Sequence, residues 1–229
     1  MLYIFAPVGG RGILNILRAN FINPSINIIQ EAYRILKSCG LVVGVTDTLY
    51  GIFADPFRDE CVSRIYVVKK RKGKPIPLLA SSPKAVFSIT NINHNLQRFL
   101  EVIWPGPVTV ILKPIDSIFS EEIHLGTEKI GFRVPASPLP RKLAELNGGF
   151  ITGTSANISG LKPAKNIEEA IKQLGNNIDL YIDSGTAPIG EPSTVIDLTS
   201  EKPLIVRDGV VSYRSIIRLY KHIVSKNHE

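Results

Sequence analysis

The sequence predicts an α/β protein in which helices pack on a twisted, mixed β-sheet. Stretches with helical spacing of apolar residues alternate along the chain with short, apolar β-like runs. This alternation lacks the strict rhythm of a doubly wound fold, and the last β-like runs lie close enough in sequence to pair as antiparallel neighbours. Polar segments follow several of the β-like runs, and α/β proteins often bind ligands at such strand ends.

The first half of the chain contains three predicted helices. Residues 28–37 place Ile28, Ala32, Ile35 and Leu36 on one helical stripe, and Gly40 follows where a C-terminal cap is expected. The other two helices are expected over 59–68, with Asp59 as a possible cap, and over 93–103, which must end before Pro105. Strands are expected over 41–45, 76–80 and 108–113.

The second half continues the alternation after a loop or short helical turn over residues 115–128. Helices are predicted over 139–146, 167–174 and 213–224, the last of them capped by Ser212. Strands are expected over 130–135, 150–154, 179–183, 193–198 and 203–207. The sequence shows no internal repeat, and no linker is long enough to mark a second domain. Residues 28–229 are therefore predicted to form one domain.

Composition limits the class of protein. The chain has 229 residues, 44% of them hydrophobic, and a net charge of +7, which favours anionic partners such as nucleotides or RNA. No apolar run reaches the roughly 20 residues that a membrane helix needs. Only Cys39 and Cys61 occur, and they are expected to be core thiols in a reducing compartment.

Residues 1–27 differ from the rest because they contain Arg11 and Arg18 but no acidic residue. Two interpretations stay open. The segment could be a mitochondrial presequence, although its glycines would interrupt a leading helix, or it could be a disordered extension. The expected location is accordingly cytoplasmic, mitochondrial or both, and the segment is left out of the predicted fold.

Five cations occur between Lys69 and Lys74, with no acid among them. By itself such a run is most often a solvated basic loop. Its position between a predicted helix and a predicted strand favours a second interpretation, because dense positive charge at such a junction suits phosphate binding.

Several familiar sites are excluded. The sequence has no GxxxxGK[ST] P-loop and no glycine-rich dinucleotide fingerprint. Its four histidines are scattered, and no Cys/His spacing indicates zinc. No complete nucleophile-elbow motif surrounds Ser155, which argues against a hydrolase triad.

A series of motifs, taken in order, resembles the YrdC family of L-threonylcarbamoyladenylate synthases. The motifs are TDTLYG after a strand, KKR after the next helix, PGPVT, FRVP, TSAN, and STVID followed by VRDG. Each one is weak alone, but their order over residues 28–218 is specific. Val45 stands where the first motif usually has Pro, and the KGK segment after Arg71 is short.

The resemblance implies a twisted α/β sheet with a basic concave face and a nucleotidyltransferase activity. In the family reaction, L-threonine, bicarbonate and ATP give L-threonylcarbamoyladenylate and pyrophosphate. This is the first step of threonylcarbamoyladenosine formation at tRNA position 37, and the product passes to a separate tRNA threonylcarbamoyltransferase. The longer type in this family carries an additional C-terminal domain, and the chain resembles the short, single-domain form.

The same resemblance implies the site residues. Lys69, Arg71, Ser155 and Asn157 match the KxR and SxN signatures and would serve catalysis and ATP binding, together with Thr194 and Arg207. The L-threonine substrate would contact Thr46, Arg133, Thr152 and Ser193. Mg²⁺ is expected to arrive on the ATP phosphates, without a dedicated protein cage.

Two alternatives stay open. The chain could be an RNA-binding module for tRNA or double-stranded RNA without catalysis, and weak tRNA binding is possible for the enzyme as well. It could also correspond to the carbamoyl-transfer domain of hydrogenase-maturation proteins, although that domain occurs within a much longer chain.

Overall fold

The computed structural model describes residues 2–5, 14–116, 118–200 and 202–224, and it contains two six-stranded mixed sheets. The first sheet has the order β1-β2-β10-β3-β4-β9. Its strands are β1 Leu2–Phe5, β2 Leu14–Arg18, β3 Val42–Val45, β4 Tyr50–Phe53, β9 Thr154–Ser155 and β10 Leu180–Asp183. The second sheet has the order β12-β11-β6-β7-β5-β8. Its strands are β5 Leu78–Ala80, β6 Val108–Leu112, β7 Ile130–Arg133, β8 Phe150–Thr152, β11 Thr194–Asp197 and β12 Leu204–Arg207.

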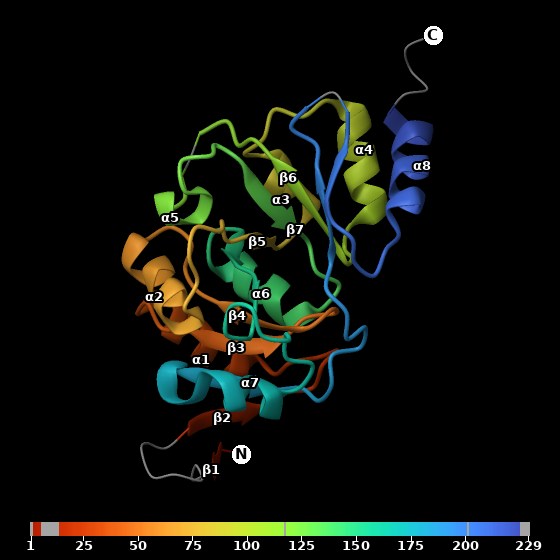
Figure 1. The fold of residues 1–229 in the computed structure, drawn as a ribbon. Helices are drawn as coiled ribbons and strands as arrows, with labels where there is room; N and C mark the ends of the chain where they lie inside the picture. Colours follow the sequence, from red (N-terminus) through yellow and green to blue (C-terminus); the bar gives the residue numbers. More distant parts are fainter. Residues whose placement is uncertain (1, 6–13, 117, 201, 225–229) are drawn as a thin grey trace.

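The helices lie around these two sheets (Figure 1). Near the first sheet are α1 Ile26–Lys37, α2 Asp59–Lys69 and α7 Ile167–Leu174, and the short turn η1 Gly175–Asn177 follows α7. Near the second sheet are α3 Pro83–Phe87, α4 His94–Ile103, α5 Glu121–His124 and α8 Tyr213–Val224. Helix α6 Pro138–Leu146 packs against α1 on one side and against β5 and β8 on the other, so it bridges the two sheets.

Both sheets mix parallel and antiparallel pairs, as the sequence predicts. Strand β11 is parallel to β6 and antiparallel to β12, which confirms the expected antiparallel pairing near the end of the chain. The strands divide between two sheets because β9 turns away from β8 at Gly153 and pairs with β4. The sheets meet where the Thr152 amide donates to the Ala54 carbonyl (3.1 Å) and the Ala54 amide donates to the Thr152 hydroxyl (2.8 Å).

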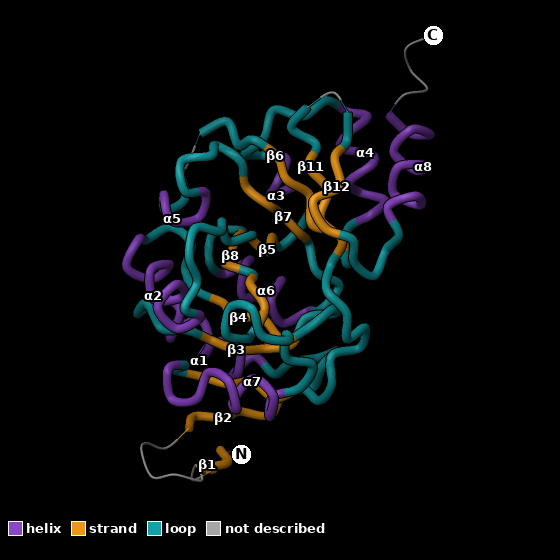
Figure 2. Tube along the Cα trace, viewed as in Figure 1, coloured by secondary structure: helices purple, strands orange, loops and turns teal. Residues whose placement is uncertain are grey.

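The predicted helices are present with ends that shift by at most two residues. Helices α7 and α8 match their predicted ranges, and the Ser215 amide donates to the Ser212 hydroxyl, as expected for an N-cap. Within residues 28–229, β4, α3 and the short turn η1 were not predicted. Strand β4 begins inside the TDTLYG segment at Tyr50, where it forms a hairpin with β3, and α3 starts after the capping residue Ser82 (Figure 2).

Residues 14–18, which lie within the predicted N-terminal extension, form β2 and belong to the first sheet. Strand β2 pairs in parallel with β10, and Leu14 and Ile16 are buried in the hydrophobic core. The composition of residues 1–27 could not reveal this pairing, because the partner strand lies more than 160 residues further along the chain. Whether the segment acts as a presequence stays a prediction, and residues 1 and 6–13 lie outside the described part of the chain.

The expectation of two separate core thiols is wrong. Cys39 and Cys61 form a disulfide that links the end of α1 to the first turn of α2. Cys39 adopts a left-handed conformation with φ of 59°, and it reverses the chain after α1 in place of the expected Gly40.

Across the residues that the structure describes, no helix is both long and apolar enough to cross a membrane.

Candidate functional site

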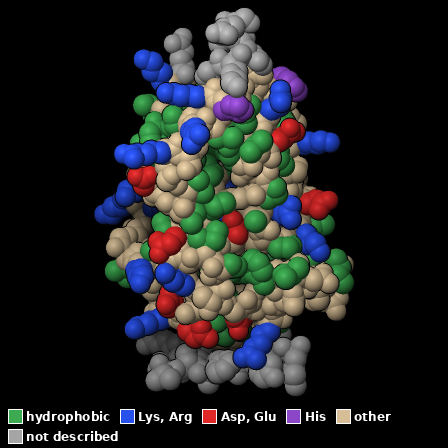
Figure 3. Space-filling view, turned by 90° about the vertical axis from the view of Figure 1, so that its right-hand side faces the viewer, with side chains coloured by type: hydrophobic (Ala, Val, Ile, Leu, Met, Phe, Trp, Pro, Cys, Tyr) green, Lys and Arg blue, Asp and Glu red, His purple; other side chains and the backbone are tan. Residues whose placement is uncertain are grey.

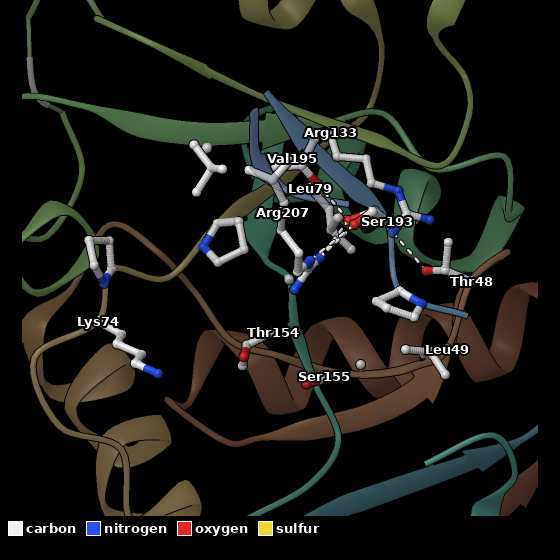
Figure 4. Close-up of a pocket in the computed structure, with 18 of the residues that line it drawn as sticks. Thr48, Leu49, Lys74, Leu79, Arg133, Thr154, Ser155, Ser193, Val195 and Arg207 are labelled. Atoms are coloured by element: carbon white, nitrogen blue, oxygen red, sulfur yellow. Dashed lines mark hydrogen bonds between the residues drawn. The ribbon is translucent and has the colours of Figure 1, made fainter. Parts of the chain in front are cut away.

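A pocket of about 660 Å³ lies between the two sheets. Its floor is the second sheet, which contributes residues of β5, β6, β7, β11 and β12. The first sheet closes it with residues of β4 and β9, and the loops after β3 and α2 complete the wall. Polar segments that lie far apart in the sequence therefore converge on one pocket (Figure 4).

The pocket is strongly cationic. Five basic side chains line it, and no Asp or Glu is among its described lining residues: the cations are Arg71, Lys74, Lys129, Arg133 and Arg207. Burial lowers the pKa of the three arginines, but a guanidinium keeps its proton in proteins. Closely spaced positive groups in a partly enclosed site favour an anionic ligand.

One corner of the pocket is built by Arg133 and the TDT segment. The Arg133 guanidinium donates to the Thr48 hydroxyl (2.8 Å) and the Gly106 carbonyl (3.1 Å), and it forms a buried ion pair with Asp47. Thr46 holds the turn, because its hydroxyl donates to the Leu49 carbonyl (2.7 Å). Thr46, Thr48 and Arg133 all line the pocket, so this corner presents two hydroxyls beside a fixed guanidinium.

The C-terminal strands supply a second group around Ser193. Arg207 donates to the Ser193 carbonyl (2.8 Å) and hydroxyl (3.0 Å), and the Thr109 and Ser193 hydroxyls are 2.9 Å apart. Thr194 faces away, since its hydroxyl donates to the Val211 carbonyl (2.6 Å) and does not line the pocket. The predicted ATP contact of Thr194 therefore does not match its position, because neighbouring strand residues point to opposite faces.

Lys69 does not line the pocket, contrary to what a direct phosphate contact would require. It is the last residue of α2 and is 1% exposed. Its ammonium donates to the carbonyl oxygens of Ser155 and Asn157, the second at 2.8 Å, and to the Asn157 side chain at 3.3 Å. Burial, followed by the charge of Arg71, lowers the pKa of Lys69 to about 7.

The SxN signature forms a turn around this ammonium. Ser155 lines the pocket and donates from its hydroxyl to the Asn157 side-chain oxygen. Asn157 is buried away from the pocket, and its amide donates to the carbonyls of Ile158 (2.8 Å) and Leu161 (2.7 Å). The KxR and SxN signatures are thus in contact through the buried Lys69 and Asn157. Of the four signature residues, Arg71 and Ser155 line the pocket.

Thr152 also lies off the pocket. It is fully buried, and its hydroxyl accepts from the Ala54 amide (2.8 Å) and lies 3.3 Å from the Ile52 carbonyl. The predicted contact with L-threonine does not match this position. Thr154 of β9 lines the pocket instead, beyond the Gly153 turn.

Arg71 folds the loop that follows α2. Its guanidinium donates to the carbonyls of Lys74 (2.9 Å) and Pro75 (2.6 Å), and Tyr66 donates to the Lys74 carbonyl as well (3.0 Å). Lys70, with φ of 50°, makes the turn that separates Lys69 in the core from Arg71 at the pocket. Because α2 ends at Lys69 and the chain turns at Lys70, the side chains of Lys69 and Arg71 point to different parts of the protein.

Sequence reasoning missed several lining residues. Thr48 belongs to the same TDT segment as Thr46, so the motif itself is a signal for this residue. Lys129 precedes the IGFRVP strand, where no local signal marks it, and its ammonium bonds Asp197 at 3.0 Å. Lys74 belongs to the cationic run but not to the KxR signature, and it lines the pocket.

The described residues offer no carboxylate cage for Mg²⁺ in the pocket. In the described part of the chain, the group of three metal-type ligands that lie close together is Cys39, Glu60 and Cys61, whose two sulfurs are bonded to each other. The protein therefore does not fit a resident Mg²⁺, and the metal on ATP stays a prediction about the substrate.

Comparisons with known proteins agree with the sequence motifs. The family model for Sua5, YciO and YrdC proteins, described as "Telomere recombination", matches residues 34–209. A relative from Methanocaldococcus jannaschii is 31% identical, and the match covers 78% of this chain and 84% of that protein. The threonylcarbamoyl-AMP synthase of Pyrococcus abyssi is 30% identical over 85% of this chain and 58% of its own length. The structure of P. abyssi Sua5 complexed with L-threonine superposes with a TM-score of 0.84 at 28% identity, and it is matched over 91% of this chain and 61% of its own.

Proposed function

Because this chain belongs to the Sua5, YciO and YrdC family, we propose that it is a threonylcarbamoyl-AMP synthase. It joins L-threonine and bicarbonate to the adenylyl group of ATP and releases pyrophosphate. The observation that carries this proposal is the convergence of five cations in one pocket whose described lining contains no carboxylate. ATP, bicarbonate and the threonine carboxylate are all anions, so such a pocket suits their simultaneous binding.

The chemistry needs positive charge more than it needs a nucleophile from the protein. The threonine amine first attacks the carbon of bicarbonate, and water leaves as a C–O bond breaks, which gives a carbamate. A carbamate oxygen then attacks the α-phosphorus of ATP. The bond from the α-phosphorus to the bridging oxygen breaks, and its electron pair leaves with pyrophosphate. Fixed cations around this point gain strength as negative charge moves to the leaving group, which lowers the barrier.

The corner of Arg133, Thr46 and Thr48 is the proposed site for L-threonine. The guanidinium is held by Asp47 and Gly106, so it loses little freedom when it meets a carboxylate. The hydroxyls of Thr46 and Thr48 can bond the polar groups of the substrate. The structure of the P. abyssi relative complexed with L-threonine supports an amino-acid site in this fold.

Arg71, Ser155, Ser193 and Arg207 are the proposed contacts for the nucleotide and the reacting groups, since all four line the pocket. Lys69 and Asn157 act through the turn that holds Ser155, and they are therefore positioning residues. Thr152 and Thr194 support the sheets from outside the pocket.

The test is an incubation of the protein with ATP, L-threonine and bicarbonate, followed by detection of threonylcarbamoyl-AMP by mass spectrometry and of pyrophosphate by a coupled assay. Both products should form together, and omission of any one substrate should abolish both. Arg71→Ala should reduce the rate at least tenfold, because it removes a pocket cation and loosens the loop after α2. Pyrophosphate release at the wild-type rate without threonine would overturn the proposal.

The product is proposed to supply a separate tRNA-modifying transferase. The RNA-binding alternative has less support, because the cations that the structure brings together line a pocket of about 660 Å³ rather than an extended surface. On the face shown in Figure 3, Lys and Arg side chains are interspersed with Asp and Glu. A steep salt dependence of tight tRNA binding, without catalysis, would favour the alternative.

A further inference from the structure

The Cys39–Cys61 disulfide lies outside the pocket, and the proposed reaction does not use it. It joins the turn after α1 to the first turn of α2, and its two ends differ in exposure. Cys39 is half-buried, whereas Cys61 is fully buried. A small reagent that reaches the bond from solvent therefore meets the Cys39 sulfur first.

The surroundings of the two sulfurs also differ in charge. Cys61 is the third residue of α2, and this helix begins without a side-chain cap. The positive end of a helix stabilises a thiolate in its first turn, which offsets part of the cost of burying that thiolate. The Glu60 carboxylate, in contrast, lies 3.2 Å from the Cys39 sulfur, where it disfavours a second negative charge. Access and charge thus both favour attack at Cys39, with Cys61 as the sulfur that leaves.

The contact between α1 and α2 does not depend on the disulfide alone. Arg64 donates to the Cys39 carbonyl (2.7 Å), and Arg58 donates to the Lys37 carbonyl (2.7 Å). Arg64 also pairs with Asp179 at 2.9 Å, and the inner face of α2 belongs to the hydrophobic core. These contacts can persist after the sulfur bond opens, so the folded protein accommodates the dithiol. A disulfide becomes easier to reduce when its reduced form is stabilised in this way.

We propose that the Cys39–Cys61 pair is a site of thiol–disulfide exchange, at which a small thiol forms a mixed disulfide with Cys39. This proposal is independent of the proposed function. The thiolate of the small thiol attacks the Cys39 sulfur, the Cys39–Cys61 bond breaks, and its electron pair stays on Cys61, which takes up a proton. A second thiol attacks the small-molecule sulfur of the mixed disulfide and releases Cys39, which is protonated in turn. Overall, the protein disulfide is reduced to two thiols, and two small thiols are oxidised to one disulfide.

The first experiment asks whether the bond opens in the folded protein. Wild type is incubated with glutathione in native buffer, and alkylation followed by mass spectrometry gives the reduced fraction over time. The rate should rise in proportion to the thiolate concentration and stay nearly constant with urea below the unfolding transition, because no global unfolding is needed. The circular dichroism of the reduced protein should match that of the oxidised protein. A negligible rate in native buffer that rises steeply with urea would overturn the inference.

The second experiment asks which sulfur exchanges. Cys61→Ser and Cys39→Ser are a matched pair, because each loses the same bond and keeps one thiol. With glutathione disulfide as the probe, Cys61→Ser should form its mixed disulfide about tenfold faster than Cys39→Ser, since a buried thiol is protected from reagents. Peptide mapping then locates the added glutathione.

Equal rates for the two variants, or a faster reaction at Cys61, would overturn the assignment of Cys39 as the sulfur that is attacked. If either variant does not fold, the rapid alkylation of partly reduced wild type decides the same point: the glutathione adduct should be found on Cys39, and an adduct on Cys61 would contradict the proposal. Both experiments are carried out without ATP or threonine, so their outcome does not depend on the proposed function.

Discussion

Lys69 is a buried ammonium group surrounded by carbonyl oxygens. Its pKa of about 7 lies below the ordinary value of 10.5, because burial penalises the charged form. Between these two values the unfolded chain binds a proton that the folded chain releases. Raising the pH through this window therefore increases the contribution of Lys69 to the free energy of unfolding.

We expect Lys69→Met to remove this pH dependence. From pH 7 to pH 9, the free energy of unfolding of wild type should rise by about 1–2 kcal/mol relative to that of the variant. Urea denaturation at several pH values measures the difference. Lys72→Met, at an exposed position, should keep the wild-type slope, whereas the same slope in Lys69→Met would contradict the prediction.

The ion pair between Arg133 and Asp47 is the second prediction at this scale. Both side chains are 7% exposed, and the second Asp47 carboxylate oxygen is buried without a hydrogen-bond partner. Asp47→Asn leaves the guanidinium charge buried and uncompensated, so it should lower the free energy of unfolding by about 3–5 kcal/mol.

A matched control is Glu128→Gln, which breaks the exposed pair with Lys113 at 3.7 Å and should cost less than about 1 kcal/mol. Adding Arg133→Met to Asp47→Asn should recover part of the loss, because the buried charge is then removed as well. If Asp47→Asn and Glu128→Gln lowered the free energy of unfolding in urea by the same amount, the buried pair would contribute no more to stability than the exposed pair.

Between elements, the Cys39–Cys61 disulfide joins α1 to α2 across a separation of 22 residues. Closing a loop of this length restricts the unfolded chain and should add about 3 kcal/mol to the free energy of unfolding. Reduction with dithiothreitol should lower the thermal midpoint of wild type. Cys39→Ser should start from the lower midpoint and show no response to the reductant. A midpoint in wild type that does not change on reduction would mean that the bond does not form in solution.

Across the whole molecule, the two sheets enclose a site whose described lining carries five cations and no acid. Such a site should attract the more highly charged substrate most strongly, and salt should screen that attraction. Raising the salt concentration from about 50 to about 300 mM should increase the KM for ATP several-fold. The KM for threonine should increase by a smaller factor. Equal salt sensitivity of both constants would argue against an electrostatic origin.

Much of this architecture follows from local sequence patterns. The helical stripes, the strand after α1 and the strand that carries Arg133 all appear where periodicity predicts them, because burial of one face requires apolar residues at fixed spacing. The motif order also indicated Arg71, Arg133, Ser155, Ser193 and Arg207, which all line the pocket.

For the other predicted site residues, the residue type does not reveal whether the side chain points into the pocket or away from it. Ser193 and Thr194 are neighbours of similar chemistry, yet one lines the pocket and the other bonds Val211 on the opposite face. Lys69 and Lys74 belong to the same cationic run, but Lys69 lies in the core and Lys74 lines the pocket. A charge run shows that positive groups are present, and the turn at Lys70 and the grip of Arg71 decide where each one lies.

The sequence by itself determined the α/β class, the order of most helices and strands, and the set of polar motifs, because these depend on neighbouring residues and their spacing. Only the tertiary structure decided that β2 joins the sheet beside β10, that Cys39 meets Cys61, and that the strands form two sheets with a pocket between them. These features arise from contacts between residues far apart in the chain. Such contacts form only when the whole core packs, and no local pattern encodes them.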